Sequence, residues 1–259
     1  MSGTWDAAAY DQVATPHVAW GQEVVGRLAL DGSEVVLDAG CGTGRVTELV
    51  LTRAPGVRLV ALDASVDMIH EARRRLAPWG GRVSFVVGDL RQGLPGPVDA
   101  VLSTATFHWI HDHDRLFANL ARALPAGGQL VAQCGGAGNI AGVRRALAEL
   151  GARVDDARFP TPEQTAAALA RAGFDGARCW LQAAPTTFAS LEELERFLAT
   201  VILRHQLAEV AAPDRPAFVR EVATRLPDRR IDYVRLNITA RRGGDPRASP
   251  GRPGPGRCG

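Results

Sequence analysis

Continuous apolar runs alternate with helically spaced stretches through the first half of the chain. Five apolar runs lie between residues 34 and 135 and read EVVLDAG, VRLVALD, RVSFVVGD, VDAVLSTAT and GGQLVAQCG. Between them, apolar residues recur at helical spacing in residues 45–51, 66–76 and 114–124. Runs without polar alternation are typical of parallel strands that are buried on both faces. The order therefore predicts a doubly wound α/β fold, with helices on both faces of a parallel sheet and right-handed crossovers.

The pattern changes after residue 138. Residues 139–175 are mostly helical in pattern, with a loop at FPTPEQ, and a sixth strand is expected in ARCWLQAAPTTF. A long amphipathic helix over 191–210 and a short one over 216–226 precede a last strand in DYVRLNITAR. We expect the helices between the last two strands to form a lid beside the carboxyl edge of the sheet.

These patterns divide the chain into three predicted segments. Residues 1–30 form an N-terminal helical cap, and residues 31–242 form one α/β domain whose part 139–230 includes the lid. Residues 243–259, rich in Gly, Pro and Arg, form a disordered tail. The tail has too little apolar surface to offset the entropy lost on ordering.

Charge and composition narrow the function classes. The formal net charge is +2, and the three Arg and one Asp of the tail account for it, so the rest of the chain is balanced. A balanced domain lacks the broad basic surface of a nucleic-acid binder. No apolar run approaches the roughly 20 residues of a membrane-spanning helix, and no signal-peptide pattern begins the chain, so we expect a cytoplasmic protein. The four scattered cysteines predict neither a zinc site nor a disulfide framework.

Glycines occupy alternate positions where the first predicted strand ends. Gly40, Gly42 and Gly44 follow this strand, and Asp38 lies two positions upstream. Glycine lets backbone approach a ligand without a Cβ atom, and ligands of open α/β sheets bind at the carboxyl ends of the strands. A dinucleotide site is usually spelled G-x-G-x-x-G/A, but Arg45 stands where that site needs a small residue. The spelling D-x-G-x-G-x-G therefore disfavours NAD.

The same spelling resembles the first motif of the class I S-adenosylmethionine-dependent methyltransferases. The resemblance implies a Rossmann-like sheet of seven strands, the last one antiparallel, and S-adenosylmethionine as the cofactor. It also implies that Asp38 holds the ammonium group of the cofactor. The methionine part would lie over the loop residues Gly40, Cys41, Gly42 and Gly44. A nearby carboxylate suits a ligand that carries ammonium and sulfonium charges.

The second strand ends in a stretch that also resembles this family. Asp63 lies where an acid accepts hydrogen bonds from both ribose hydroxyls, and ASVDMIHEA follows it. The resemblance implies that Ala64 and Met68 contact the cofactor, Met68 through adenine. A helix N-terminal acid at Asp63 and a core position for Met68 are the structural alternatives.

The third and fourth strands complete the match. In VVGDL, the resemblance implies that Asp89 accepts from the adenine amino group, with Gly88 beside it and Leu90 as a backbone donor. The stretch from Ser103 to Phe107, after the fourth strand, would line the methyl-transfer point. A simple turn residue is the alternative for Asp89.

A narrower resemblance covers most of residues 5–242. YDQVATPHVAWGQEVV, STATFHWIHDHDRLFANLARALPAGGQL and DYVRLNITARR resemble the small-molecule branch that includes trans-aconitate methyltransferase. In that branch the N-terminal segment covers the cofactor, which implies a place for Tyr10 in the site. The match is loose over residues 139–235, which should shape the acceptor pocket, so it does not identify the acceptor.

His108 follows the fourth strand, where the acceptor must arrive. A neutral imidazole there could take a proton from an acceptor hydroxyl, and Tyr10 is a second candidate base. A buried, hydrogen-bonded structural histidine is the alternative. His111 and His113 are expected in a solvated loop before a helix that Asp112 or Asp114 caps. No second ligand cluster supports a metal site.

Six further residues are candidates for acceptor binding. The aromatic residues that could wall an apolar pocket are Phe107, Trp109 and Trp180, with simple packing as the alternative. The residues that could bind an acidic acceptor are Arg204, His205 and Arg235, with surface exposure as the alternative for the arginines. The predicted function is in-line methyl transfer to a small-molecule carboxylate or hydroxyl. A non-catalytic binder of the same cofactor is the main rival, and the chain is expected to be a monomer or homodimer. A nucleic-acid methyltransferase is disfavoured because STATFHW stands where the N/D-P-P-Y/F motif is common.

Overall fold

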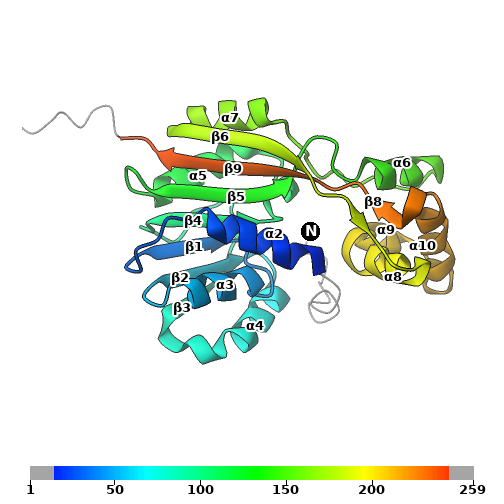
Figure 1. Cartoon of the computed structure of the whole chain (residues 1–259), viewed down its shortest axis with the longest axis horizontal. Coiled ribbons are helices and arrows are strands. Elements are labelled where there is room, and N and C mark those ends of the chain that lie inside the picture. Colours follow the sequence, from blue (N-terminus) through cyan, green and yellow to red (C-terminus); the bar gives the residue numbers. More distant parts are fainter. Residues whose placement is uncertain (1–14, 245–259) are drawn as a thin grey trace, which may run out of the picture.

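A seven-stranded sheet forms the centre of the protein (Figure 1). The structure is a computed structural model that describes residues 15–244, and its strand order is β3-β2-β1-β4-β5-β9-β6. The strands are β1 (Val35–Ala39), β2 (Arg58–Asp63), β3 (Val83–Val87), β4 (Ala100–Thr104), β5 (Gln129–Gly135), β6 (Phe174–Ala183) and β9 (Val234–Arg242). Strand β9 is antiparallel to both neighbours, and the other six are parallel to one another. The predicted topology is confirmed.

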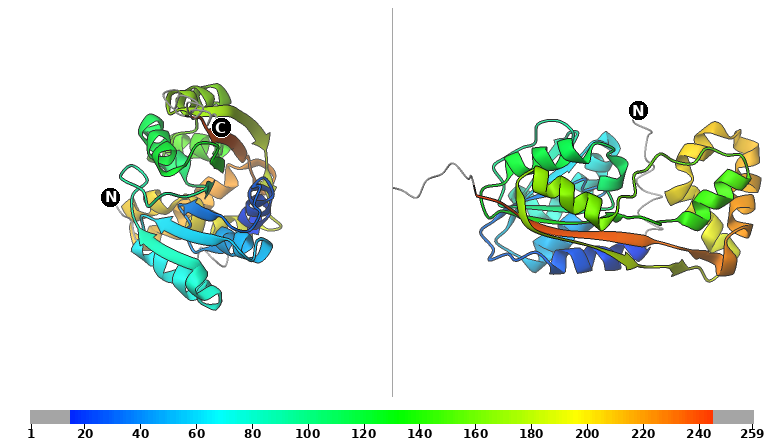
Figure 2. Two further views of the ribbon diagram at one scale, coloured as in Figure 1. Left: turned by 90° about the vertical axis from the view of Figure 1, so that its left-hand side faces the viewer. Right: turned by 90° about the horizontal axis from the view of Figure 1, so that it is seen from above.

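Helices cover both faces of the sheet (Figure 2). On one face lie α2 (Thr15–Gly26), α3 (Arg45–Arg53) and α4 (Val66–Arg75), and on the other lie α5 (His113–Ala123) and α7 (Pro162–Arg171). Val36 packs in the first cluster and its neighbour Leu37 in the second, so successive residues of β1 are buried on opposite sides. This two-sided burial explains the unbroken apolar runs. Helix α2 lies within the predicted N-terminal segment, whose residues 1–14 are outside the described part.

A second group of helices has an apolar cluster of its own, at the far end of β6 and β9 (Figure 1). We call it the lid, and it consists of α6 (Ala141–Glu149), α8 (Leu191–Phe197), α9 (Arg204–Glu209) and α10 (Arg215–Thr224). The two-residue strands β7 (Thr186–Thr187) and β8 (Arg230–Ile231) pair beside it. Helix α7, although within residues 139–230, contacts α5 and β6 instead. None of the helices in residues 15–244 is long and apolar enough to cross a membrane.

The long helix predicted over residues 191–210 is interrupted. Between α8 and α9, the segment η3 (Leu198–Ile202) has π-helical hydrogen bonding, and Leu203 N donates to Leu198 O at 2.8 Å. The prediction of one continuous helix was wrong because apolar spacing continues through this turn and does not reveal the wider backbone. The short 3₁₀ segments are η1 (Ala77–Arg82), η2 (Phe107–Trp109), η4 (Ala212–Asp214) and η5 (Pro227–Arg229).

Buried polar side chains join α2 to β5, β9 and β6. The Oδ1 atom of Asn237 accepts from Arg27 Nη1 at 2.6 Å and from Gln133 Nε2 at 2.8 Å. Its Nδ2 atom donates to Gln182 Oε1 at 3.1 Å. Asn237 is fully buried, so its amide satisfies three polar partners that would otherwise lose hydrogen bonds. This network fixes α2 across the sheet.

Asn237→Ala removes the shared amide and leaves buried donors unpaired. We expect the free energy of unfolding to fall by about 1–3 kcal/mol, because an unsatisfied buried polar group costs that much. Urea unfolding would measure it, with Gln182→Ala, at a more exposed position of the network, as the matched control. If Asn237→Ala lowered the free energy of unfolding no more than Gln182→Ala does, Asn237 would not be the residue that holds the network together.

Candidate active site

The glycine loop after β1 adopts a backbone that favours glycine at three positions. Gly40, Gly42 and Gly44 have φ angles of 84°, 53° and 82°. A Cβ atom on Gly40 would lie 2.2 Å from Thr106 Oγ1, whereas one on Gly42 would meet no atom of residues 15–244 within 4 Å. Gly44 is the N-cap of α3 and lies against Leu76 of the α4 end. The loop therefore has one position that faces open space, where a ligand could approach the backbone.

Asp63 anchors this loop to the end of β2. Its Oδ2 atom accepts from Gly42 N and its Oδ1 atom from Ser65 N, both at 2.9 Å. Burial raises the pKa of Asp63, and the backbone hydrogen bonds oppose that shift. Each oxygen accepts one of these amide hydrogens and has a second lone pair, so the carboxylate can still accept from a ligand hydroxyl.

Asp38 is a fully buried acid at the end of β1. Thr47 Oγ1 donates to its Oδ2 atom at 2.6 Å, and among the described residues its buried Oδ1 atom has no hydrogen-bond partner. Burial, and to a smaller extent the charge of Asp63, raise the pKa of Asp38 to about 7. An orphaned carboxylate oxygen beside a second carboxylate is a site that favours a cation. The predicted contact of Asp38 with an ammonium group fits this geometry.

The neighbouring residues of the first two motifs differ in exposure. Cys41 is buried in the glycine loop, and burial raises the pKa of its thiol well above the ordinary value. Met68 is buried on α4 but belongs to none of the three apolar clusters, whereas Ala64 is exposed at the turn before α4. Burial outside those clusters agrees with a place for Met68 beside a ligand. Its contact with adenine stays a prediction.

The acid after β3 has a side-chain partner. The guanidinium of Arg91 donates to both carboxylate oxygens of Asp89, with Nη2 at 2.6 Å from Oδ2, and this pairing lowers the pKa of Asp89. Gly88 N donates to Asp63 O, and the buried Leu90 accepts from Asn119 through its carbonyl. Gly88 thus lies beside the end of β2 and Leu90 contacts α5. Any contact between Asp89 and adenine would share the carboxylate with Arg91.

The end of β4 is hydrogen-bonded to the glycine loop. Ser103 Oγ donates to Ala39 O at 2.7 Å, and Thr106 Oγ1 donates to Gly40 O at 3.2 Å. Ala105 between them has a left-handed φ of 54°, which is strained for a residue with a Cβ atom. Ser103 therefore connects strands, and Thr106, whose role the sequence did not single out, fills the space beside Gly40. The missing Cβ at Gly40 was the signal that a neighbour approaches closely.

Phe107 lies in the apolar core. Its side chain is fully buried and contacts Phe117 edge-on, with ring centroids 5.9 Å apart. Phe107 belongs to the apolar cluster that includes Leu116 and Phe117 of α5, which favours the packing alternative, and its contact with an acceptor stays a prediction. Trp109 is 43% exposed and remains available to an acceptor.

His108 is buried beside Trp109 and Phe159, with ring centroids 4.9 and 5.8 Å away. Gly135 N donates to its Nδ1 atom at 3.3 Å. Since Nδ1 accepts a hydrogen bond, the proton of the neutral ring resides on Nε2. His108 in this tautomer carries its donor at Nε2, and its Nδ1 lone pair already accepts from Gly135 N, which favours a hydrogen-bond donor. A role of His108 as a general base stays a prediction.

The following histidines also differ from the prediction. His113 is buried and its Nε2 atom hydrogen-bonds Phe107 O at 3.0 Å, so it was wrongly expected in a solvated loop. His111 is exposed and lies 3.6 Å from Asp156. Asp112 caps α5 by accepting from Arg115 N, as one of the two predicted caps. Within residues 15–244, no three His, Cys, Asp or Glu residues gather as a metal site.

The two predicted arginines lie on different elements. Arg235 is buried on β9, with its guanidinium 4.5 Å from the ring centroid of Trp20 and its Nε atom 3.4 Å from Gln133 Oε1. Arg204 begins α9 of the lid. Tyr10 lies outside the described residues. The structure thus places the two arginines on the sheet and on the lid, and an acceptor role for either stays a prediction.

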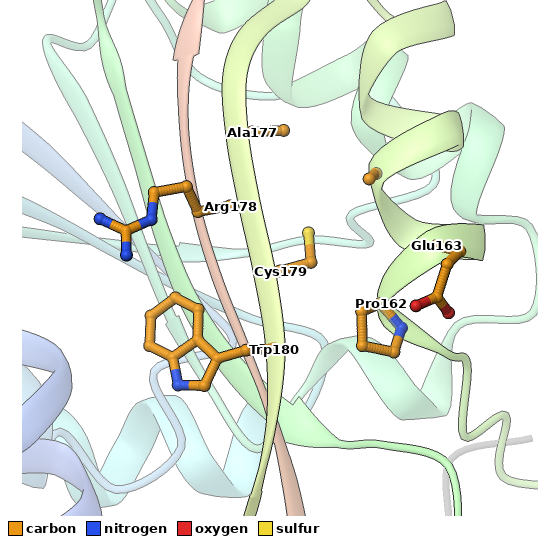
Figure 3. Close-up of a pocket in the computed structure, with 7 residues that line it drawn as sticks. Pro162, Glu163, Ala177, Arg178, Cys179 and Trp180 are labelled. Atoms are coloured by element: carbon orange, nitrogen blue, oxygen red, sulfur yellow. The ribbon is translucent and has the colours of Figure 1, made fainter.

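A surface depression of about 410 Å³ lies elsewhere, at the β6 edge of the sheet (Figure 3). Cys179 points toward α7, whereas Arg178 and Trp180 point away from it. Strands β4, β5 and β9 separate this edge from β1. The depression is therefore not the site formed by the glycine loop.

Known proteins match the glycine-loop region. Residues 36–128 match the family model of a methyltransferase domain. The trans-aconitate 2-methyltransferase of Azoarcus sp. is 35% identical over 131 residues, which are 50% of each chain. The malonyl-[acyl-carrier protein] O-methyltransferase of Xylella fastidiosa is 32% identical over 68% of this chain and 60% of that protein. The chain thus spans about half the length of several curated relatives that it matches.

Solved structures share the fold. The phosphoethanolamine N-methyltransferase 2 of Haemonchus contortus, in complex with S-adenosyl-L-methionine, has a TM-score of 0.62 and 19% identity. The similarity covers 92% of this chain and 57% of that one. At this identity the likeness establishes the fold alone.

Asp38→Asn tests the buried charge directly. The variant can still accept from Thr47 but cannot ionise. Because the pKa of Asp38 is about 7 in the folded protein and 3.8 is its ordinary value, the folded state holds a proton that the unfolded chain has released between these pH values. The stability of the natural protein should therefore fall as pH rises from about 4 to about 7, and more steeply than that of the variant. Parallel urea-unfolding curves for both proteins across this range would refute the assignment.

Proposed function

We propose that the protein binds S-adenosylmethionine and transfers its methyl group to a small carboxylic acid, since residues 36–128 match the family model of a methyltransferase domain. The observation that carries the proposal is the buried Oδ1 atom of Asp38, which has no hydrogen-bond partner among residues 15–244, beside Asp63 and the open face that Gly42 presents within the same residues. A ligand with ammonium and sulfonium charges matches one fully buried and one partly buried carboxylate.

The residues present fit this cofactor. Asp38 would hold the ammonium group through Oδ1, and Gly42 would allow the methionine part to lie against the backbone. Asp63 would accept from the ribose hydroxyls with its remaining lone pairs, and Met68 would contact adenine. Asp89, already paired with Arg91, would accept from the adenine amino group.

The bound cofactor supplies an electrophilic methyl group. The chain's own contribution is to hold the acceptor in line with that group and to exclude water. The hydrogen bonds from Ser103 and Thr106 to the glycine loop keep the end of β4 against the cofactor site. His108, two residues beyond Thr106, would donate through Nε2 to an acceptor oxygen.

The tautomer of His108, with its proton on Nε2, favours a methyl acceptor that binds in its ionised form. A carboxylate is already deprotonated at neutral pH and needs a donor to position it rather than a base. The names of the two relatives, trans-aconitate 2-methyltransferase and malonyl-[acyl-carrier protein] O-methyltransferase, agree with acidic acceptors.

We also propose that the protein is located in the cytoplasm.

The direct test uses S-adenosylmethionine labelled at the methyl group, incubated with the protein and a panel of carboxylic acids, phenols and amines. We expect label on carboxylic acids. Label on amines alone would contradict the acceptor class. Tight cofactor binding without label on any compound would favour the non-catalytic binder instead.

Asp63→Asn should weaken the binding of S-adenosylmethionine by about 1–3 kcal/mol. One hydrogen-bond acceptor for the ribose hydroxyls is lost, while the size of the side chain is kept. Titration calorimetry measures the affinity. Asp175→Asn, at an exposed position of β6, is the matched control and should bind like the natural protein. Unchanged affinity of Asp63→Asn would remove Asp63 from the cofactor site.

His108 variants separate a donor from a base. His108→Gln retains an N–H donor near the place of Nε2 and should keep kcat/KM for a carboxylic acid within about fivefold, whereas His108→Phe should lose about tenfold or more. Protonation of the imidazole abolishes a base but not a donor. At saturating cofactor, kcat of the natural protein should therefore not fall as pH is lowered toward about 6. A steep fall that is absent in His108→Gln would show that His108 is a base.

A further inference from the structure

A second histidine lies at the junction of the sheet and the lid. His205 is on α9, and its ring contacts Trp109 edge-on, with centroids 5.9 Å apart. Trp109 in turn contacts the ring of His108, with centroids 4.9 Å apart. The three rings form a row from the buried end of β4 to the lid. Trp109 and His205 are 43% and 51% exposed, so a solute can reach this end of the row.

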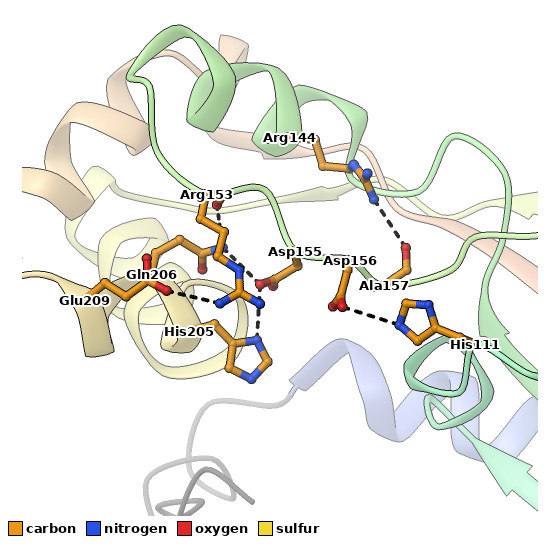
Figure 4. A network of polar contacts seen from close by, with 9 residues as sticks. All are labelled: His111, Arg144, Arg153, Asp155, Asp156, Ala157, His205, Gln206 and Glu209. Carbon is orange, nitrogen blue, oxygen red and sulfur yellow. Dashed lines mark hydrogen bonds and ion pairs between the residues drawn. The ribbon is translucent and has the colours of Figure 1, made fainter. Parts of the chain in front are cut away.

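Asp155 determines which ring nitrogen of His205 carries the proton (Figure 4). The Nδ1 atom of His205 lies 3.1 Å from Asp155 Oδ1, and Gln206 Nε2 donates to the same oxygen at 3.1 Å. A carboxylate oxygen accepts and cannot donate, so Nδ1 carries the proton of the neutral ring. The lone pair is then on Nε2. His205 therefore accepts through Nε2, whereas His108 donates through Nε2.

Residues of the lid helix α9 hold Asp155 and the segment before it in place. Gln206 is buried and also donates to Arg153 O at 2.9 Å, and Arg153 pairs with Glu209 at 3.1 Å. These contacts tie the segment before Asp155 to α9, the helix that carries His205 (Figure 4). The carboxylate and the imidazole thus belong to one local unit, and the polarity of His205 does not depend on how the lid meets the sheet.

We propose that His205 is an acceptor-specificity residue that receives a hydrogen bond from a hydroxyl group of the acceptor. The inference rests on the proposed function and narrows its acceptor to hydroxylated carboxylic acids. The carboxylate of the bound acid would accept a hydrogen bond from His108 Nε2, and its apolar part would lie on Trp109. Its hydroxyl group would donate a hydrogen bond to His205 Nε2. The opposite polarities of the two imidazoles require opposite groups on the ligand.

The test measures binding, so it does not depend on turnover. The probes are benzoic acid, 3-hydroxybenzoic acid and 3-methoxybenzoic acid, titrated at about pH 7.5 into the full chain saturated with S-adenosylhomocysteine. The methoxy compound has an oxygen at the same position but cannot donate. The variants are His205→Asn, which can keep the hydrogen bond to Asp155 but lacks Nε2, and His111→Asn as an exposed control histidine. Thermal unfolding of each variant checks that it folds.

We expect the natural protein and His111→Asn to bind 3-hydroxybenzoic acid about fivefold more tightly than either other acid. In His205→Asn the three affinities should become equal. Equal affinities in the natural protein, no binding of any acid, or a hydroxyl preference that survives in His205→Asn would overturn the proposal. Failure of the proposed function is distinguishable, because it would appear as a lack of binding by S-adenosylmethionine or as no transfer of label.

Discussion

Two neighbouring carboxylates, Asp38 fully buried and Asp63 partly buried, govern this site. Asp38 and Asp63 end neighbouring strands, and their partners in the described part of the chain are Thr47 and backbone amides. Loss of hydration raises the pKa of both groups, and the charge of Asp63 adds a smaller rise at Asp38. A ligand cation beside them would favour their ionised forms. A ligand can approach the glycine loop at Gly42, where a Cβ atom would meet no described atom within 4 Å, so electrostatics as well as the fold support the proposed cofactor.

The acceptor side depends on the same loop. Thr106 occupies the space beside Gly40, and the strained Ala105 directs the chain so that Phe107 enters the core and His108 remains beside β5. A change at the end of β4 would therefore be felt by the cofactor loop. This contact couples the two halves of the site through packing and short hydrogen bonds. Strain of this kind is tolerated where the surrounding structure fixes the backbone.

Local patterns predicted the features that depend on local chemistry. Glycine spacing predicted the left-handed loop, and unbroken apolar runs predicted the two-sided sheet. The tautomer of His108, the burial of His113 and the π-helical turn could not be predicted, because each depends on a contact with a distant segment or on a backbone detail that apolar spacing conceals. The Asp155 and His205 pair was missed for the same reason, since fifty positions separate its members in the sequence.

The most direct test of the account is the number of protons released when S-adenosylmethionine binds. Calorimetric titrations at about pH 6.5, in two buffers that differ in ionisation enthalpy, give this number. The account predicts net release of a fraction of a proton by the natural protein, because the bound cation favours ionised Asp38, and much less release by Asp38→Asn. Binding with no release by the natural protein, or with equal release by both proteins, would contradict the claim that a buried, partly protonated carboxylate receives the cofactor.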